Sequence, residues 1–300
     1  MNRRDFLKTG GAALGLAAAR PAVFAVEAKT ETVAAPGRSL KKGIMWATVG
    51  LKGSVLEKMQ AVKAAGFEGV EMMSHMDQEE VLKARDACGL VIPSVCGAQH
   101  WSHPLSDPDP KVREEGVQAL KQTLRDGKRY GVTSVLLVPA VVKKEISYAD
   151  AYTRSQAEIR KAIPLAEELG VKIAVENVWN QFLLSPLEAA RYVDEFNSPA
   201  VGWHFDVGNV INYGWPEQWI RILGKRIQKL HIKEFSRKKM NEQGLGAGFQ
   251  VAYLQGDNNW PAIMKALDDI AYNGWGIAEQ DSPGSLEALQ DLDQVARGLG

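Results

Sequence analysis

The chain has 300 residues, with 36 Lys and Arg against 36 Asp and Glu, so its formal net charge is zero when His is neutral. Hydrophobic residues make up 45% and charged residues 24%, which is typical of a globular protein and excludes a largely disordered or collagen-like chain. The balanced charge provides no broad attraction to nucleic acid or to an anionic membrane surface. We therefore expect a small-molecule partner, and the sequence leaves a homo-oligomer open.

The first 25 residues have the pattern of an export signal. Arg3 and Arg4 precede a weakly apolar stretch rich in Gly and Ala, residues 10–19, that is too short to span a bilayer. This pattern resembles the twin-arginine signal, and the small residues before and at Ala25 predict cleavage there. The resemblance implies a periplasmic protein without stable membrane insertion after cleavage; an uncleaved anchor is the alternative. We expect residues 26–40 to be a flexible lead-in and residues 41–300 to form one catalytic domain.

The chain has two cysteines, Cys88 and Cys96. An oxidising compartment would permit a disulfide between them, but Cys88 falls late in a helical pattern and Cys96 late in a strand pattern. We expect two buried free thiols.

From Lys41 onward, helical patterns run repeatedly through a Gly-containing turn into a short apolar strand, which is the chemistry of helix-to-strand turns in parallel sheets. The expected helix and strand pairs are 55–65 with 69–71, 112–130 with 134–138, 157–169 with 172–176, and 263–272 with 275–279. Further strands are expected at 43–48, 91–95, 201–206 and 227–233. About eight strands alternating with helices over roughly 260 residues predict an α/β fold of the (β/α)₈ TIM-barrel type.

The rival fold is a doubly wound open sheet. It is disfavoured because residues 48–54, after the first strand, lack both the G-x-G-x-x-G and the G-K-[ST] spacing of phosphate-binding turns. The longest stretch without a clear pattern is 235–260, which is rich in Gly and follows a strand. A barrel would carry an active-site loop at that place.

In a barrel, alternate side chains of each strand point into the interior. The polar side chains that this alternation sends inward are those of Glu71, Glu176, His204, Asp206, His231 and Lys233. Glu279 shares its face with the apolar Ile277, so its orientation is inferred from its place at the end of the last strand.

Three carboxylates and one imidazole fall at the carboxyl ends of successive strands, where they can converge: Glu176, Asp206, His231 and Glu279. Three negative charges brought together would raise their pKa values unless a cation neutralised them. One divalent metal ion answers this need, and mixed oxygen and nitrogen ligands suit Mn²⁺, Mg²⁺, Co²⁺ or Zn²⁺, of which we favour Mn²⁺. Each residue also has an explanation that needs no metal. A carboxylate at a strand end could form a salt bridge or cap a helix, and His231 could be a hydrogen-bonded histidine of the core.

Several segments carry a resemblance to a known family: Val-Glu-Asn at 175–177, His-Phe-Asp-Val-Gly-Asn at 204–209, His-Ile-Lys-Glu at 231–234, Gly-Asp-Asn-Asn-Trp at 256–260 and Ile-Ala-Glu at 277–279. With these segments, residues 41–300 resemble the sugar phosphate isomerase/epimerase superfamily with the xylose isomerase-like barrel. The likeness is greatest to its hydroxypyruvate isomerase and ketose 3-epimerase branch. The motifs are more specific for the superfamily than for one substrate.

The resemblance implies that Glu176, Asp206, His231 and Glu279 are metal ligands. It further implies that Glu176 and Glu279 are the two catalytic proton-transfer groups, acting on a ketose or ketosugar through a metal-stabilised enediolate. Arg237 resembles the family's arginine that holds substrate oxygens; a solvated surface charge is its alternative.

Two departures from the family concern the substrate. Asn209 stands where the epimerases usually have a histidine that contacts the substrate, and we expect Asn209 to bind substrate there; residues 180–183 lack the additional glutamate of the epimerases. The other residues expected to line a substrate pocket are Glu71, His100, His103 and Lys233, with Trp46, Trp101 and Trp179 placed to stack on a sugar. Core packing is the alternative for each Trp.

Three other functions compete with the isomerase reading. They are a metal-dependent lyase that cleaves a 3-keto-glycoside by elimination, a non-catalytic sugar-binding barrel, and an endonuclease IV-like barrel. The last would need more His and Asp ligands and a more basic chain. The loops after the seventh and eighth strands show no Gly-rich or Arg-paired phosphate site, which disfavours a phosphorylated sugar.

Overall fold

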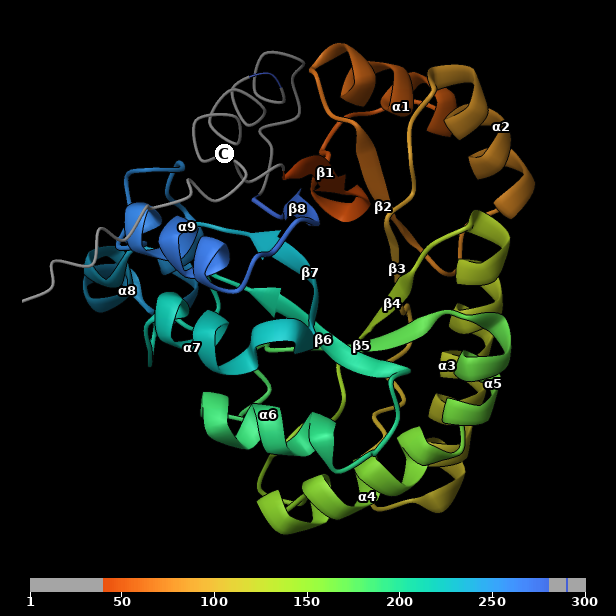
Figure 1. Cartoon of the computed structure of the whole chain (residues 1–300), viewed down its shortest axis with the longest axis vertical. Coiled ribbons are helices and arrows are strands. Elements are labelled where there is room, and N and C mark those ends of the chain that lie inside the picture. The colour runs from red at the N-terminus through yellow and green to blue at the C-terminus, as the bar shows by residue number, and fades with distance from the viewer. Residues whose placement is uncertain (1–39, 281–289, 291–300) are drawn as a thin grey trace, which may run out of the picture. The chain divides into compact units, whose positions relative to one another are not determined.

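The computed structural model describes residues 40–280 and residue 290. Within them, parallel strands close into a barrel in which each strand pairs with the next and β8 pairs with β1 (Figure 1). The strands are β1 Lys41–Met45, β2 Gly69–Met73, β3 Ser94–Cys96, β4 Ser134–Leu137, β5 Lys172–Glu176, β6 Val201–Asp206, β7 Ile227–Ile232 and β8 Trp275–Ala278. The predicted (β/α)₈ barrel is confirmed.

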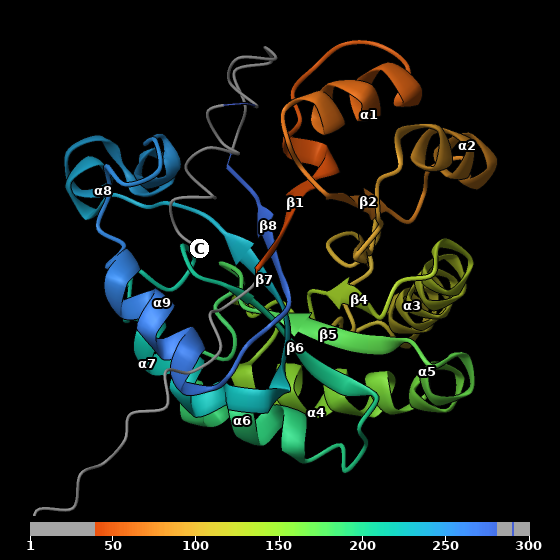
Figure 2. The same ribbon diagram turned by 45° about the horizontal axis from the view of Figure 1, so that its top comes forward.

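Helices surround the strands (Figures 1 and 2). They are α1 Val55–Ala64, α2 Gln78–Cys88, α3 Pro110–Tyr130, α4 Tyr148–Arg160, α5 Ile163–Leu169, α6 Pro186–Asp194, α7 Pro216–Leu223, α8 Arg237–Gln243 and α9 Trp260–Asp269. Three 3₁₀ segments, η1 Trp46–Thr48, η2 Gly224–Arg226 and η3 Leu245–Phe249, complete the described elements. Among the residues described, no helix combines the length and the apolar character needed to cross a membrane.

Local sequence signals set many of the helix ends. Ser54 begins α1 with a capping box, in which its side chain accepts from the Glu57 backbone N–H and the Glu57 side chain accepts from the Ser54 backbone N–H. Gly131 and Gly170 end α3 and α5 in the left-handed conformation, as the Gly-containing turns predicted.

Two expected helices and one expected loop differ from the structure. The helix expected at 157–169 is two helices, α4 and α5, because Pro164 lacks a backbone N–H and sits in the first turn of a new helix. Helix α9 ends before Ile270, earlier than expected, so Gly274 is not its cap. The stretch 235–260 is not a plain loop, since it contains α8 and η3.

Strand boundaries follow the apolar runs closely; β2 continues to Met73, β4, β7 and β8 each end one residue earlier than expected, and the main differences are in β1 and β3. Strands β5 and β6 span the expected residues. Strand β1 ends at Met45 because Trp46 begins a 3₁₀ turn. Strand β3 begins at Ser94 rather than at residue 91, since Val91 makes only an isolated bridge to Gly69.

The strands have two faces with different surroundings. The outward side chains belong to the core shared with the helices, including those of Ile173, Val175, Trp203 and Phe205. A separate, smaller apolar group contains Met45, Cys96, Leu136 and Ile277. Ile277 therefore shares the inner face with Glu279, which explains why the last strand lacked a clean polar alternation.

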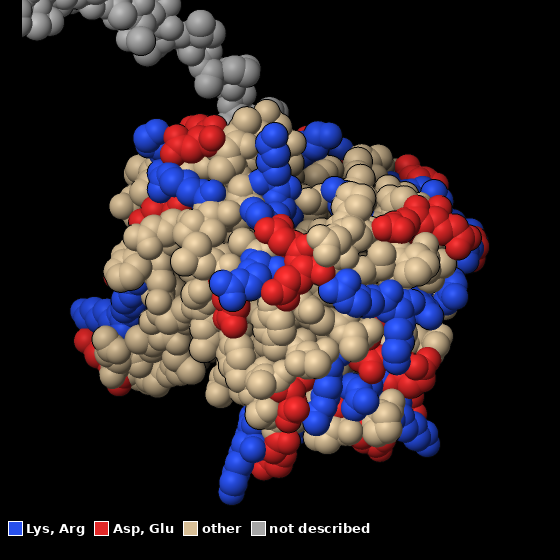
Figure 3. All heavy atoms as spheres, turned by 60° about the horizontal axis from the view of Figure 1, so that its bottom comes forward, with Lys and Arg blue, Asp and Glu red and all other residues tan. Residues whose placement is uncertain are grey.

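Two further expectations concern cysteine and charge. Cys88 and Cys96 are free thiols, as predicted, but only Cys96 is buried; Cys88 is partly exposed. On the face drawn in Figure 3, Lys and Arg are interspersed with Asp and Glu, and no single sign covers the surface.

Candidate metal centre and substrate pocket

The four predicted ligands meet at the carboxyl ends of the last four strands. Glu176 ends β5, Asp206 ends β6, His231 lies near the end of β7, and Glu279 directly follows β8. One ligand atom of each lies within 4.8 Å of the ligand atoms of the others. His231 Nδ1 is 2.8 Å from Glu176 Oε1 and 3.0 Å from Glu279 Oε2.

Strand pairing brings these side chains together. Asp206 lies opposite His231 in the register of β6 and β7, and the backbone N–H of Val207 donates to the His231 carbonyl at 3.2 Å. The N–H of Glu279 donates to the Ile232 carbonyl at 3.0 Å, so pairing with β7 continues past the end of β8. This bond fixes the backbone of Glu279 at the level of the cluster.

Asn177 holds the backbone of β6 from the neighbouring strand. Its Oδ1 accepts from the Asp206 N–H at 3.0 Å and from Trp203 Nε1 at 3.1 Å, and its Nδ2 donates to the Asp206 carbonyl at 2.8 Å. Asn209 adds a bond from its backbone N–H to Asp206 Oδ1 at 2.8 Å. The sequence offered Asn177 only as part of a motif, and this positioning role was not predicted.

Lys233 lies within the cluster. Its Nζ is 2.7 Å from Glu279 Oε2 and 3.2 Å from Asp206 Oδ2, and its ammonium also faces the Phe249 ring, 5.0 Å from the ring centroid. The alternation of β7 had predicted that this side chain points inward with His231.

Burial and charge shift the pKa values of the cluster in opposite directions. Burial raises the pKa of Glu176 to about 7, with the charge of His231 opposing the shift. Burial raises the pKa of Asp206 to about 6, opposed by Lys233. Burial also acts to raise the pKa of Glu279, but His231 and Lys233 outweigh it and hold that pKa well below its usual range. The carboxylates in turn hold the pKa of His231 well above its usual range, against the effect of burial.

These residues fit a divalent metal ion. The donor set is three carboxylates and one imidazole, a mixture that Mn²⁺, Mg²⁺, Co²⁺ and Zn²⁺ accept. The oxygens Asp206 Oδ2 and Glu279 Oε2 are buried, and their close contacts with the Lys233 ammonium and, for Glu279, with His231 Nδ1 are ion pairs without hydrogen-bond geometry. A bound cation would satisfy both oxygens and reduce the repulsion among the three acids.

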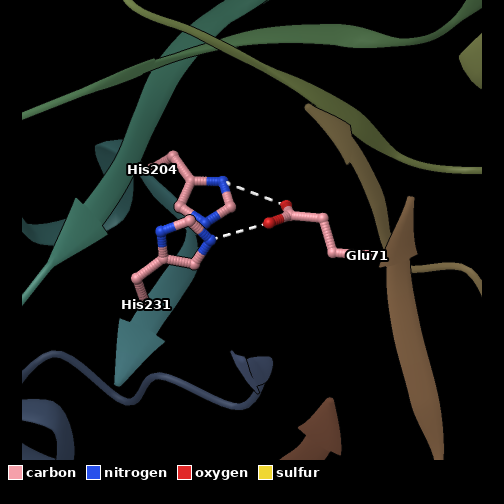
Figure 4. Close-up of side chains that lie close together, drawn as sticks. All are labelled: Glu71, His204 and His231. Atoms are coloured by element: carbon pink, nitrogen blue, oxygen red, sulfur yellow. Dashed lines mark hydrogen bonds and ion pairs between the residues drawn. The ribbon is translucent and has the colours of Figure 1, made fainter. Parts of the chain in front are cut away.

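Glu71 was predicted to bind substrate, and the structure places it elsewhere. It is fully buried and faces His231 and His204 (Figure 4). It is not one of the residues that line the pocket. Its carboxylate accepts from Ser94 Oγ at 2.5 Å and from His231 Nε2 at 2.7 Å, while His204 Nδ1 lies 3.9 Å away. Since Nε2 of His231 faces Glu71, Nδ1 faces Glu176 and Glu279. A carboxylate behind an imidazole is the arrangement that orients metal-binding histidines.

A cavity of about 370 Å³ opens at the cluster, and Glu176, His231, Lys233 and Glu279 line one part of it. Of the predicted pocket residues, His100, Trp101, Trp179 and Asn209 also line it. The remaining lining residues are Met45, Met73, Cys96, Gly97, Ala98, Leu136, Val138, Val178 and Phe249. Its volume is within the range of about 300–1,000 Å³ that is usual for small-molecule sites.

Three other predicted pocket residues lie outside this lining. Arg237 begins α8, and its guanidinium donates to the Gly214 carbonyl at 3.1 Å and lies over the Trp215 ring. Trp46 lies under the ammonium of Lys58, and His103 pairs with Glu115 at 3.3 Å.

Glu234 fastens the segment after β7 to the barrel. Its Oε2 accepts from Trp260 Nε1 at 2.7 Å and from the Leu254 N–H at 2.9 Å, and its Oε1 accepts from the N–H groups of Phe235 and Asn258 at 3.2 Å each. This segment supplies Phe249 to the pocket wall. Glu234 was part of the His-Ile-Lys-Glu motif, but this anchoring role was not predicted.

The fold and the site define a TIM barrel with a candidate metal centre at the carboxyl ends of its strands. The family described as xylose isomerase-like TIM barrel matches residues 59–299, and the chain belongs to this family. The protein SgbU of Escherichia coli strain K12, provisionally assigned as an L-ribulose-5-phosphate 3-epimerase, is 24% identical over 257 residues. That alignment covers 81% of this chain and 89% of SgbU.

Solved structures share the fold. An L-ribulose 3-epimerase superposes with a TM-score of 0.71 at 20% identity, covering 87% of this chain and 94% of the other. The 3-keto-D-glucoside 4-epimerase YcjR of E. coli superposes with a TM-score of 0.70 at 16% identity, covering 86% of this chain and all of YcjR. The predicted enzyme class, a sugar isomerase or epimerase, is the class of these relatives.

Proposed function

We propose that the protein is a divalent-metal-dependent sugar isomerase or epimerase in which Glu176 and Glu279 transfer protons to and from the substrate. The observation that carries this proposal is the convergence of four ligand atoms within 4.8 Å beside a cavity of about 370 Å³. The family and the names of the relatives support it.

The metal would be held by Glu176, Asp206, His231 and Glu279, and when bound it supplies positive charge beside the substrate oxygens on which negative charge develops. Mn²⁺ is our first choice. Asp206 is fully buried and does not line the cavity, so its role is confined to binding the metal.

Glu176 and Glu279 both line the cavity and come from different sides of the barrel, on β5 and after β8. His231 and Lys233 keep Glu279 ionised, so it is present in the carboxylate form that can accept a proton. Glu176 has a pKa raised to about 7 by burial, which suits a group that gives and takes a proton near neutral pH. Proton removal by one glutamate and return by the other would invert or move a centre beside a carbonyl.

The test combines metal content with exchange of substrate hydrogen for solvent deuterium. The protein is reconstituted separately with manganese, cobalt, magnesium and zinc and incubated with ketoses in D₂O. We expect exchange in the wild type and a loss of at least 100-fold in Glu176→Gln and Glu279→Gln, because removal of a proton-transfer group typically costs 10²–10⁴-fold.

The matched control is Glu80→Gln, which makes the same change at an exposed position on α2. This variant should exchange at the wild-type rate. Wild-type exchange in Glu176→Gln, with folding verified by thermal melting, would exclude Glu176 as a proton carrier. A folded protein that takes up none of the four metals would exclude the metal mechanism and favour a sugar-binding barrel.

We also propose export by the twin-arginine route to the periplasm. The supporting pattern lies in residues 1–25, which are outside the described residues, as is the lead-in to residue 39. Residues 1–30 fused to a reporter that is exported folded should direct it to the periplasm. Replacing both Arg3 and Arg4 with Lys should abolish export, and unchanged export would refute the proposal.

A further inference from the structure

We propose that Lys233 is a substrate-binding residue that competes with the divalent metal ion for Asp206 Oδ2 and Glu279 Oε2. Its ammonium holds a substrate oxygen once the metal occupies those two carboxylates. This inference rests on the proposed function and adds to it a residue and an order of binding, because the metal must bind before the ammonium is free. An ion pair that only fastens Lys233 to the barrel would persist when the metal binds.

The first argument is that both cations need the same oxygens. Asp206 Oδ1 accepts from the Asn209 N–H at 2.8 Å, whereas Oδ2 takes no part in that bond. Glu279 Oε2 is 3.0 Å from His231 Nδ1, the nitrogen that faces the ligand cluster. Lys233 Nζ lies 3.2 Å from Asp206 Oδ2 and 2.7 Å from Glu279 Oε2. The ammonium therefore stands against the oxygens that the cluster would offer to a metal.

The second argument is the charge of the cluster. Its carboxylates, Glu176, Asp206 and Glu279, carry three negative charges when they are all ionised. A divalent metal ion supplies two positive charges and Lys233 supplies a third, so the site is neutral with both cations present. Two cations in contact with one oxygen repel each other strongly, however. The ammonium must then move away from the shared oxygens while it stays close to the site.

The cavity offers the ammonium such a position. Lys233 lines the cavity, as does Phe249, and its side chain is 16% exposed. Nζ is 5.0 Å from the centroid of the Phe249 ring, which is within the range of a cation–π contact. That ring is fixed by Trp179 at 4.7 Å and by the fully buried Phe235 at 4.9 Å. A turn of the flexible lysine stem can take Nζ off the carboxylates while it keeps the contact with the ring.

An ammonium at this place suits a substrate oxygen that gains negative charge. Lys233 Nζ is next to Glu279, one of the two proposed proton-transfer groups, so a short movement leaves it beside the reacting carbon. A cationic donor already in place when charge develops on an oxygen lowers the barrier to proton removal. The role of Lys233 is to bind that oxygen, and the proton transfers remain with Glu176 and Glu279.

The first measurement is Mn²⁺ affinity, by competition with a chelator. Lys233→Met keeps most of the side-chain length and removes the competing charge, so we expect Mn²⁺ to bind roughly 10–100-fold more tightly, the value of one charge-assisted contact. Lys233→Arg keeps the charge and should bind Mn²⁺ about as the wild type does. Lys265→Met makes the same change at a side chain that is 72% exposed on α9, and it should leave the affinity unchanged.

The second measurement follows the ammonium itself and needs no activity. Wild-type protein is treated briefly with acetic anhydride before and after saturation with Mn²⁺, and the acetylated lysines are identified by mass spectrometry. Acetylation of Lys233 should rise several-fold with Mn²⁺, because the ammonium leaves its two carboxylates. Acetylation of the exposed Lys265 should stay the same.

The third measurement is deuterium exchange into a ketose at saturating Mn²⁺. Lys233→Met should lose roughly 100-fold in kcat, the cost of removing one donor to a developing oxyanion, although it binds the metal more tightly. Lys233→Arg should recover part of the rate. Damage to the fold would instead weaken metal binding and exchange together, and thermal melting checks the fold of each variant.

The outcomes separate this inference from the function on which it rests. Unchanged Mn²⁺ affinity in Lys233→Met, Lys233 acetylation that Mn²⁺ does not alter, or wild-type exchange in Lys233→Met would overturn the inference and leave the isomerase proposal standing. A wild-type protein in which Mn²⁺ exposes Lys233 but no ketose exchanges would overturn the isomerase proposal and support the competition. A folded protein that binds none of the four metals would overturn both.

Discussion

Replacing Glu71 with Gln should weaken metal binding without removing any residue that lines the cavity. Glu71 is fully buried, and its two carboxylate oxygens accept separately from Ser94 and His231. The variant keeps the shape of the side chain and removes its charge. The Glu71 to His231 bond would become a neutral one, or the amide would turn and present its NH₂ to Nε2.

The magnitude follows from that one bond. A hydrogen bond to a charged group contributes about 1.5–3 kcal/mol, roughly twice the value of a neutral bond. If the amide NH₂ faces Nε2, the imidazole proton moves to Nδ1, which is the atom that faces Glu176 and Glu279. Either result disfavours the metal-binding form of His231, and we expect a loss of about 10–100-fold in metal affinity.

The assay is competition for Mn²⁺ against a chelator of known affinity, with melting temperature and the pH profile of activity measured in parallel. Ser94→Ala provides a graded comparison, because it removes one partner of Glu71 and leaves its charge. We expect its affinity to lie between those of wild type and Glu71→Gln. Wild-type metal affinity and an unchanged pH profile in a folded Glu71→Gln would refute the reasoning that this carboxylate orients His231.

Three further predictions concern positions outside the ligand cluster. Burial lowers the pKa of Lys229 to about 8, so the folded state binds fewer protons than the unfolded state between about pH 8 and 10.5. Over that window, urea denaturation should show the free energy of unfolding of the wild type rising by up to ~3 kcal/mol relative to that of Lys229→Met. Parallel plots of unfolding free energy against pH for the two proteins would contradict this. Asn177→Ala removes three buried hydrogen bonds and should lower the free energy of unfolding by ~2–4 kcal/mol, measured by denaturant titration; a loss below ~1 kcal/mol would show that these bonds contribute little. Gly256→Ala should raise KM with unchanged metal content, because a Cβ there would overlap the Phe235 carbonyl and the Glu234 carboxylate; an unaltered KM would mean that the segment accommodates the methyl group.

Much of the site was predictable because strand alternation and strand ends are local properties of a sequence. The alternation in β6 and β7 placed Asp206, His231 and Lys233 on the inner face, and their positions at strand ends placed them at one rim of the barrel. These expectations required only the two-residue period of a strand and the rule that parallel strands end on the same side.

Depth within the barrel was not predictable in the same way. Glu71 points inward as expected, but Met73, two residues later on β2, reaches the level of the cavity, and Glu71 lies one layer below. The relative height of residues on neighbouring strands depends on how the whole barrel is staggered, which no single segment encodes. The direction of Arg237 was equally hidden, because it depends on where α8 begins inside a stretch without a clear pattern.

Glu234 anchors the segment after β7 to the barrel. This anchoring separates the proposed chemistry from the choice of sugar, so that evolution or engineering could change one without the other. The proposed chemistry is built on strands, whose geometry is fixed by the barrel ladder. The surface that would determine sugar selectivity includes Phe249, which lines the cavity and lies on the segment that Glu234 hydrogen-bonds to the barrel. Substitutions within residues 245–253 would then change which sugars are bound, while the proton-transfer groups keep their positions. Such a division makes this barrel a scaffold in which new substrates can be sampled without rebuilding the reaction centre.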